Sequence, residues 1–118
     1  MIHLLNWFQI NYPHLKQALL ESNHNFNNRE TNPYHVEGDC WSHTMMVCKV
    51  AELRGYDRVV QVSALLHDIG KSDPAREHSK TGARIARPIL ERFGFKPFEI
   101  EDACFLIENH LLLVKTAT

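Results

Sequence analysis

The sequence predicts an all-α domain. Apolar residues recur at spacings of three and four along most of the chain, which is typical of amphipathic helices. No segment alternates apolar and polar residues as a half-buried strand would, and Gly, Pro and Asp stand where helices are expected to begin or end. The chain has 118 residues, of which 44% are hydrophobic, enough for one compact domain. We therefore expect a single domain of about five to six helices, with N-terminal helices and a loop over residues 1–33 and a helical core over residues 34–118.

Two short helices are expected in the N-terminal part, over residues 2–10 and 13–22, since Pro13 suits the first turn of a helix. The stretch 23–33 is polar, rich in asparagine and ends in Asn-Pro, which predicts a loop. The aromatic residues of this part have spacings that indicate packing against the bundle, with base stacking as the less favoured alternative; they are Trp7, Phe8, Tyr12 and Phe26.

Four further segments complete the predicted bundle. Asp39 caps a helix expected over residues 39–54, and Gly55 ends it. Asp57 caps the next helix, which runs to about residue 68 and is closed by Gly70, followed by a loop over 71–77. A helix over 78–93 should be kinked or split by Pro88, and the last is expected over 97–114.

Composition excludes several classes of protein. The net charge is −1 and the pI about 6.7, so the whole chain carries no electrostatic signature for nucleic acid or an anionic membrane, although a local basic cluster would allow nucleic acid. No signal peptide or membrane span is expected. The three cysteines form no Cys-x-x-Cys pair, which argues against a disulfide scaffold and favours a reduced, cytoplasmic setting: they are Cys40, Cys48 and Cys104.

The dipeptide His67-Asp68 is the most informative feature of the chain. It ends an apolar helical run, and burying two adjacent ionisable groups is costly unless a charge compensates them. A divalent metal ion is a usual partner of a histidine and a carboxylate. Adjacent helical positions point about 100° apart, so both side chains reach one ion only near a helix end, which Gly70 would supply.

Four histidines lie on apolar helical stripes. The stripes are His43 with Met46, Val47 and Val50; His67 with Val60 and Ala64; His78 with Gly82, Ile85 and Ile89; and His110 with Ala103 and either Leu106 or Ile107. A single such histidine is usually a hydrogen-bonded core residue. Four of them on four helices, together with an aspartate, indicate a shared metal site. Gly82 either admits a neighbouring backbone or simply packs, and the sequence does not separate these two alternatives.

These residues resemble the HD superfamily of metal-dependent phosphohydrolases. The motifs that carry the resemblance are Glu37-Gly38-Asp39-Cys40-Trp41-Ser42-His43-Thr44, Leu65-Leu66-His67-Asp68-Ile69-Gly70-Lys71 and His78-Ser79-Lys80-Thr81-Gly82-Ala83. The first motif is most similar to HD domains of tRNA nucleotidyltransferases of the CCA-adding type. The ending Asn109-His110-Leu111-Leu112-Leu113 is similar to HD domains of uridylyl-removing enzymes.

The resemblance implies a site residue by residue. His43, His67 and Asp68 would hold a first metal ion, with Asp68 bridging to a second that His78 and His110 complete. The family's final ligand is an aspartate on a later helix, beyond the position that matches His110, and the chain stops at Thr118. Asp102 stands about two turns before His110 and is a poor substitute. We therefore expect a domain shortened at its C-terminus.

The expected activity is hydrolysis of a nucleotide or another phosphate mono- or diester by a water activated on one or two divalent ions, drawn from Mn, Fe, Ni, Co, Zn and Mg. Asp68 and Lys71 would be catalytic, and Lys71, Arg76 and Lys80 would bind the phosphate, with a solvated surface as the alternative for Arg76 and Lys80. The alternative function is a catalytically incomplete module that senses nucleotide or regulates a partner. A plain bundle with core histidines is the least favoured interpretation.

Overall fold

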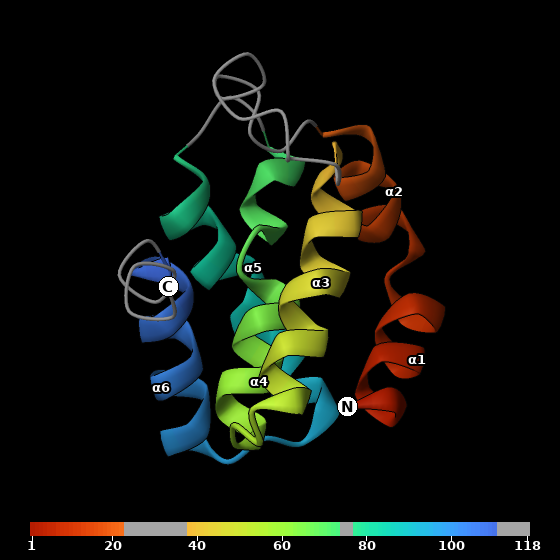
Figure 1. Cartoon of the computed structure of the whole chain (residues 1–118). Coiled ribbons are helices and arrows are strands. Elements are labelled where there is room, and N and C mark those ends of the chain that lie inside the picture. The colour runs from red at the N-terminus through yellow and green to blue at the C-terminus, as the bar shows by residue number, and fades with distance from the viewer. Residues whose placement is uncertain (23–37, 74–76, 111–118) are drawn as a thin grey trace.

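The computed structural model describes residues 1–22, 38–73 and 77–110, and its regular structure there is helical throughout (Figure 1). The elements are α1 (Ile2–Asn11), α2 (Pro13–Glu21), α3 (Cys40–Leu53), α4 (Arg58–Leu66), the short 3-10 helix η2 (Ile69–Ser72), α5 (His78–Phe93) and α6 (Pro97–Glu108). The expectation of an all-α domain with about six helices is confirmed.

Local capping chemistry sets the helix ends that the sequence predicts. The Asp39 side chain accepts a hydrogen bond from the backbone N–H of Ser42 at 2.7 Å, and the Asp57 side chain accepts one from Val60 at 3.0 Å. Each carboxylate therefore satisfies an amide that has no partner inside its own helix. Gly94 ends α5 in the left-handed region with a φ of 104°, a conformation that glycine adopts without strain.

Three expectations about boundaries need correction. Helix α4 ends at Leu66, before the expected residue 68, and η2 occupies the start of the segment expected to be a loop. Helix α5 continues unbroken through Pro88, so the chain is not split there. Helix α6 ends at Glu108 rather than at residue 114. The expected loop over 23–33 and the end of the chain from residue 111 lie outside the described residues.

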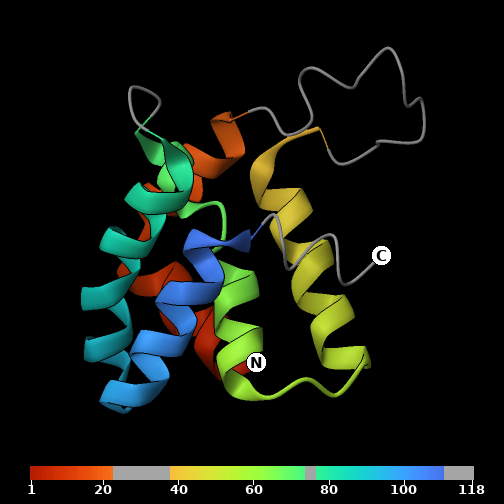
Figure 2. The same ribbon diagram turned by 90° about the vertical axis from the view of Figure 1, so that its left-hand side faces the viewer.

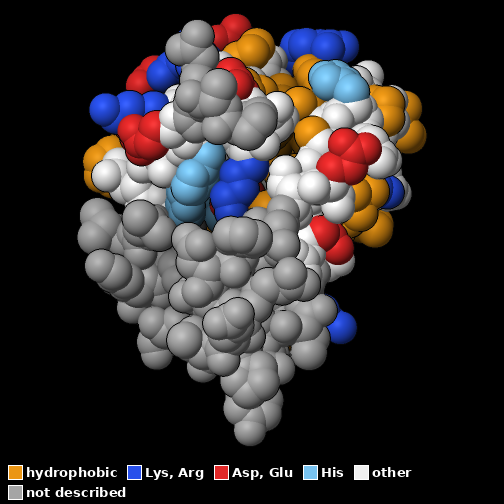
Figure 3. All heavy atoms as spheres, turned by 90° about the horizontal axis from the view of Figure 1, so that it is seen from above, with side chains coloured by type: hydrophobic (Ala, Val, Ile, Leu, Met, Phe, Trp, Pro, Cys, Tyr) orange, Lys and Arg blue, Asp and Glu red, His pale blue; other side chains and the backbone are white. Residues whose placement is uncertain are grey.

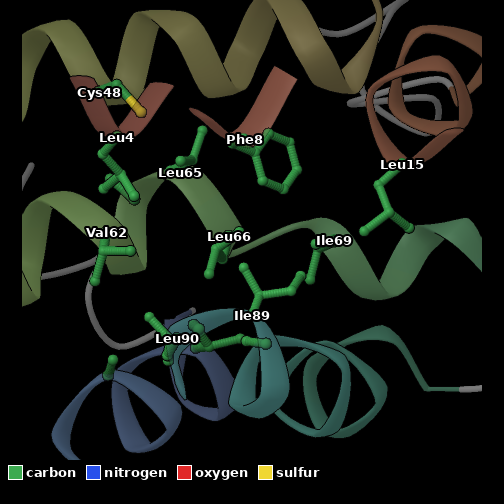
Figure 4. Close-up of a cluster of buried hydrophobic side chains, with 14 of the residues drawn as sticks. Leu4, Phe8, Leu15, Cys48, Val62, Leu65, Leu66, Ile69, Ile89 and Leu90 are labelled. Carbon is green, nitrogen blue, oxygen red and sulfur yellow. The ribbon is translucent and has the colours of Figure 1, made fainter. Parts of the chain in front are cut away.

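Helix α4 lies at the centre of the bundle. It contacts α3 on one side and α6 on the other, while α5 packs on α6 and η2 (Figure 2). The core around α4 combines fully buried side chains from several helices, among them Phe8, Leu66, Ile69 and Leu90 (Figure 4). Burial of these side chains is the main source of stability, at about 1.5–3 kcal/mol for each large one.

The N-terminal aromatic residues that the structure describes pack against the bundle, as the sequence predicts. Phe8 is fully buried and stacks on Trp41 of α3, with ring centroids 6.2 Å apart and an interplanar angle of 9°. Trp7 meets Phe93 of α5 edge-on, with centroids 5.0 Å apart. These contacts fix α1 to α3 and α5, and Phe26 lies outside the described residues.

Gly70 and Gly82 bring η2 and α5 into backbone contact. A Cβ atom on Gly70 would lie 1.9 Å from the carbonyl oxygen of His78 and 2.6 Å from the amide nitrogen of Gly82. A Cβ on Gly82 would lie 3.3 Å from the amide nitrogen of Gly70. Close backbone approach is therefore the role of Gly82 that the structure supports, and it fixes the start of α5 against the segment that carries Asp68.

The state of the cysteines and the lengths of the helices complete the description of the fold. Cys40, Cys48 and Cys104 are buried free thiols. Among the described residues, no helix combines the length and the apolar character needed to cross a membrane.

We predict that Gly70→Ala destabilises the domain by about 3 kcal/mol or more, because the new methyl group meets backbone atoms that cannot move independently. Gly82→Ala is the matched control, since its contacts are 3.3 Å or longer and its expected cost is about 1 kcal/mol. Urea unfolding followed by circular dichroism measures both. An equal loss for the two variants would show that η2 and α5 are not in tight contact.

We predict that stability falls in alkaline solution partly through Cys48. Burial raises the pKa of this thiol to about 12, whereas an unfolded cysteine titrates near about 8.5. Between these values the unfolded chain loses a proton that the folded chain keeps, so the free energy of unfolding falls as pH rises, by about 1.4 kcal/mol per pH unit for this group. Cys48→Ala should unfold more easily at pH 7 but show a shallower decline between pH 9 and 10. An unchanged slope would contradict the assignment.

Candidate metal centre

Four helix ends meet at one end of the bundle, and each carries one of the predicted histidines. His43 lies in the second turn of α3, His67 follows α4, His78 begins α5, and His110 lies just beyond α6. The starts of α3 and α5 and the ends of α4 and α6 lie at the same end of the molecule (Figure 1). Figure 3 looks onto this end and shows histidine and Lys or Arg side chains side by side near the middle of the face.

Asp68 is the centre of this cluster. Its side chain is only 2% exposed, and one oxygen, Oδ2, lies 3.1 Å from Nε2 of His67. The other oxygen, Oδ1, lies 3.9 Å from Nε2 of His110 and 4.0 Å from Nε2 of His78. A buried carboxylate is tolerated when positive or hydrogen-bonding groups surround it, and the cluster supplies them.

The ligand atoms form two groups that share Asp68. Nitrogen or oxygen atoms of His43, His67 and Asp68 all lie within 4.8 Å of one another, and the same holds for Asp68, His78 and His110. The rings confirm the convergence, with centroids 5.3 Å apart for His43 and His67 and 4.9 Å apart for His78 and His110. Either group could hold a metal ion, since imidazole and carboxylate are suitable ligands.

Backbone carbonyls orient two of the imidazoles. Nδ1 of His67 lies 2.7 Å from the carbonyl oxygen of Ala64, and Nδ1 of His110 lies 3.0 Å from that of Ile107. A carbonyl oxygen accepts only, so Nδ1 must carry the proton in both rings. Without a metal ion, a protonated His67 donates from Nε2 to the carboxylate of Asp68. In the neutral form of each ring the lone pair is on Nε2, the nitrogen that faces Asp68. This tautomer is the one that a metal ligand with an outer hydrogen-bond partner adopts.

The pKa values of the clustered residues are shifted in different directions. Burial favours the neutral forms, but the hydrogen bond and opposite charge shared by His67 and Asp68 outweigh it, so the pKa of His67 is raised and that of Asp68 is well below its usual range. Burial and the neighbouring positive groups lower the pKa of His78 and of His110. Neutral His78 and His110 are therefore favoured near neutral pH, the form needed to bind a metal ion.

The predicted phosphate-binding residues have different positions. Nζ of Lys71 lies 3.8 Å from Oδ1 of Asp68, and its side chain is 25% exposed, so it stands between the cluster and solvent. Lys80 is exposed on α5. Arg76 lies outside the described residues. Asp102 lines a separate groove between α4 and α6.

The predicted apolar stripe of His43 needs correction. Met46 and Val50 are exposed, and the buried face of α3 is formed by Trp41, Thr44 and Cys48 instead. His43 lies at the edge of this face, half-buried, and reaches the cluster from there. Helical periodicity alone predicts the stripe, and it does not identify the flank of the helix that meets α4.

Sequence reasoning missed Cys40 as a neighbour of the site. Burial raises the pKa of this buried thiol, although the nearby charge of Lys71 opposes the shift. The spacing of the two residues in the chain gives no signal for this proximity, because it depends on where the start of α3 lies relative to η2 in the folded chain.

The family of the chain follows from comparison with known proteins. Residues 40–117 match the model of the HD domain. The chain belongs to the HD domain family. All five residues of the cluster fall inside the matched range, and domains of this family bind divalent metal ions, in agreement with the cluster. Membership therefore supports hydrolase activity in general.

Curated relatives resemble about half of the chain. Bifunctional uridylyltransferase/uridylyl-removing enzymes of Nitrobacter winogradskyi and Streptomyces coelicolor are 42% identical over 59 residues and 47% identical over 57 residues. These matches cover 50% and 48% of this chain but only 6% and 7% of the relatives. These relatives support the resemblance to HD domains of uridylyl-removing enzymes. They do not specifically support the resemblance to the CCA-adding type. No solved structure matches the chain significantly.

Proposed function

We propose that the cluster around Asp68 is the active site of a metal-dependent phosphohydrolase that acts on a nucleotide or another phosphate mono- or diester. The observation that carries the proposal is the shared carboxylate, since Asp68 belongs to both groups of potential metal ligands. Two ions bridged by one carboxylate are a common arrangement for hydrolysis of phosphate esters.

His43, His67 and Asp68 would hold one ion, and Asp68, His78 and His110 would hold the other. The fit is supported by the Nδ1 contacts of His67 and His110, which leave Nε2 of each ring available as a ligand atom. When bound, a divalent ion lowers the pKa of a water molecule and neutralises charge that develops on phosphate oxygens. The mixed histidine and carboxylate donor set suits Mn, Fe, Co, Ni or Zn better than Mg.

Lys71 would bind the substrate phosphate. The contact with Asp68 at 3.8 Å holds its ammonium group beside the cluster, while part of the side chain faces solvent. An ammonium in this position attracts a phosphate as a point charge and can follow it as the reaction proceeds. His78, whose side chain is 33% exposed, marks the same open side of the site.

A nucleotidyl ester is the substrate class that the relatives favour. The name of these relatives describes removal of a uridylyl group, which is a nucleotide joined through its phosphate. The motif resemblance to domains of CCA-adding enzymes also favours a nucleotide-derived substrate.

We predict that hydrolysis of bis-p-nitrophenyl phosphate or p-nitrophenyl thymidine 5′-phosphate requires both metal and Asp68. Removal of metal by a chelator should abolish turnover, and added Mn²⁺ should restore it. Asp68→Asn should lower kcat/KM by at least about 100-fold, because it removes the carboxylate that both ligand groups share. Wild type that binds Mn²⁺ and a nucleotide without turnover would favour the sensing module over the enzyme.

We predict that Lys71→Ala raises KM for these substrates by about tenfold, the loss expected when one charged contact to phosphate is removed. Lys49→Ala is the matched control, an exposed lysine on α3 that should leave KM unchanged. Lys80→Ala tests the second predicted phosphate ligand, with a smaller effect expected because its side chain is exposed. An effect of Lys80→Ala that exceeds that of Lys71→Ala would contradict the assignment.

A further inference from the structure

We propose that the groove between α4 and α6 is a docking site for an amphipathic helix of a partner protein, one that carries basic residues beside its apolar stripe. The groove measures about 470 Å³. It is formed by the start of α4 and by one face of α6, two helices that pack side by side (Figures 1 and 2). The proposal is independent of the phosphohydrolase activity.

Two aromatic side chains dominate the groove. Phe98 is 64% exposed and Phe105 is 63% exposed, and both line it. They are seven residues apart on α6 and therefore lie on the same face of the helix. Val59, Val60 and Leu106, all half-buried, complete the apolar lining. Large exposed aromatic residues next to an apolar depression are typical of a binding surface.

The spacing of the aromatic residues suits a helix. Seven residues of α6 rise by about 10 Å, which is close to two turns. A docking helix with apolar residues at positions i, i+3 or i+4, and i+7 presents its side chains over the same length. The groove could therefore take two or three apolar side chains from such a helix.

The charges at the rim select a basic partner. Asp57 and Asp102 are exposed at the groove. Arg58 and Glu99 also line the groove, but they neutralise each other, since Nε of Arg58 lies 3.2 Å from Glu99; the guanidinium of Arg58 also lies 4.2 Å from the ring centre of Phe95. An acidic rim attracts lysine and arginine and repels nucleic acid and anionic lipid.

The same charges disfavour a second copy of this chain as the occupant. A two-fold symmetric dimer would bring the same surface patch of both molecules together. Asp102 lies between Phe98 and Phe105 on the exposed face, so the acidic groups of the two copies would meet. Like charges at such an interface reduce affinity, and we therefore assign the groove to a different protein.

The test uses a fluorescein-labelled 14-residue helical peptide of leucine and lysine, compared with a leucine and glutamate peptide of the same apolar pattern. Fluorescence anisotropy with the full chain should show at least about tenfold tighter binding of the lysine peptide. Asp102→Lys and Phe105→Ser should each weaken that binding by at least about tenfold. Ile10→Ser removes an apolar residue of α1 that is even more exposed than Phe105, and it should leave the binding unchanged. Circular dichroism confirms that each variant folds.

Several results would overturn the proposal. The lysine peptide could fail to bind, both peptides could bind equally, or binding could survive Asp102→Lys and Phe105→Ser in folded protein. Sedimentation velocity measures whether the chain associates with itself. Self-association of the wild type that Phe105→Ser abolishes would show that a second copy of the chain covers the groove.

Discussion

The burial of one carboxylate among imidazoles is the constraint on which the rest of this structure depends. Asp68 is almost fully enclosed, and His67, His78, His110 and Lys71 approach it from different elements. A buried carboxylate is stable only if its neighbours are held at fixed positions. If they moved away, its charge would remain buried without compensation. The C-terminal ends of α4 and α6 and the N-terminal end of α5 are therefore held around Asp68.

The close contact of Gly70 with α5 fixes the position of Asp68 relative to that helix. Gly70 lies two residues after Asp68, and the backbone that it touches belongs to His78 and Gly82. A side chain at position 70 would separate the carboxylate from the histidine that opens α5. Packing and chemistry thus rest on the same residues, since the backbone contact that brings α5 against η2 also sets the distance between Asp68 and His78.

Local chemistry explains what the sequence could predict. Asp39 and Asp57 indicate where helices start, because their side chains cap the first turn. The dipeptide His67-Asp68 is recognisable because two polar residues follow an apolar run. The convergence of four histidines followed from helical periodicity and the expectation that buried polar groups are satisfied together. The family resemblance placed the same residues, and the match to the HD domain supports it.

Tertiary contacts decided the features that sequence reasoning missed. Whether α4 ends at Leu66 or two residues later depends on how η2 packs against α5, and the exposure of Met46 depends on which flank of α3 meets α4. The proximity of Cys40 to Lys71 also depends on tertiary packing. Periodicity gives the direction of a side chain around its own helix but carries no information about the neighbour that it meets.

The most direct test of this account is the number of Mn²⁺ ions bound per chain, measured by elemental analysis after equilibrium dialysis. The account predicts that His43→Ala and His110→Ala each lose one ion, whereas Asp68→Asn loses both, because only Asp68 belongs to both ligand groups. If Asp68→Asn retained as much Mn²⁺ as the wild type, or lost no more than either histidine variant, the shared carboxylate would not be the centre of the site.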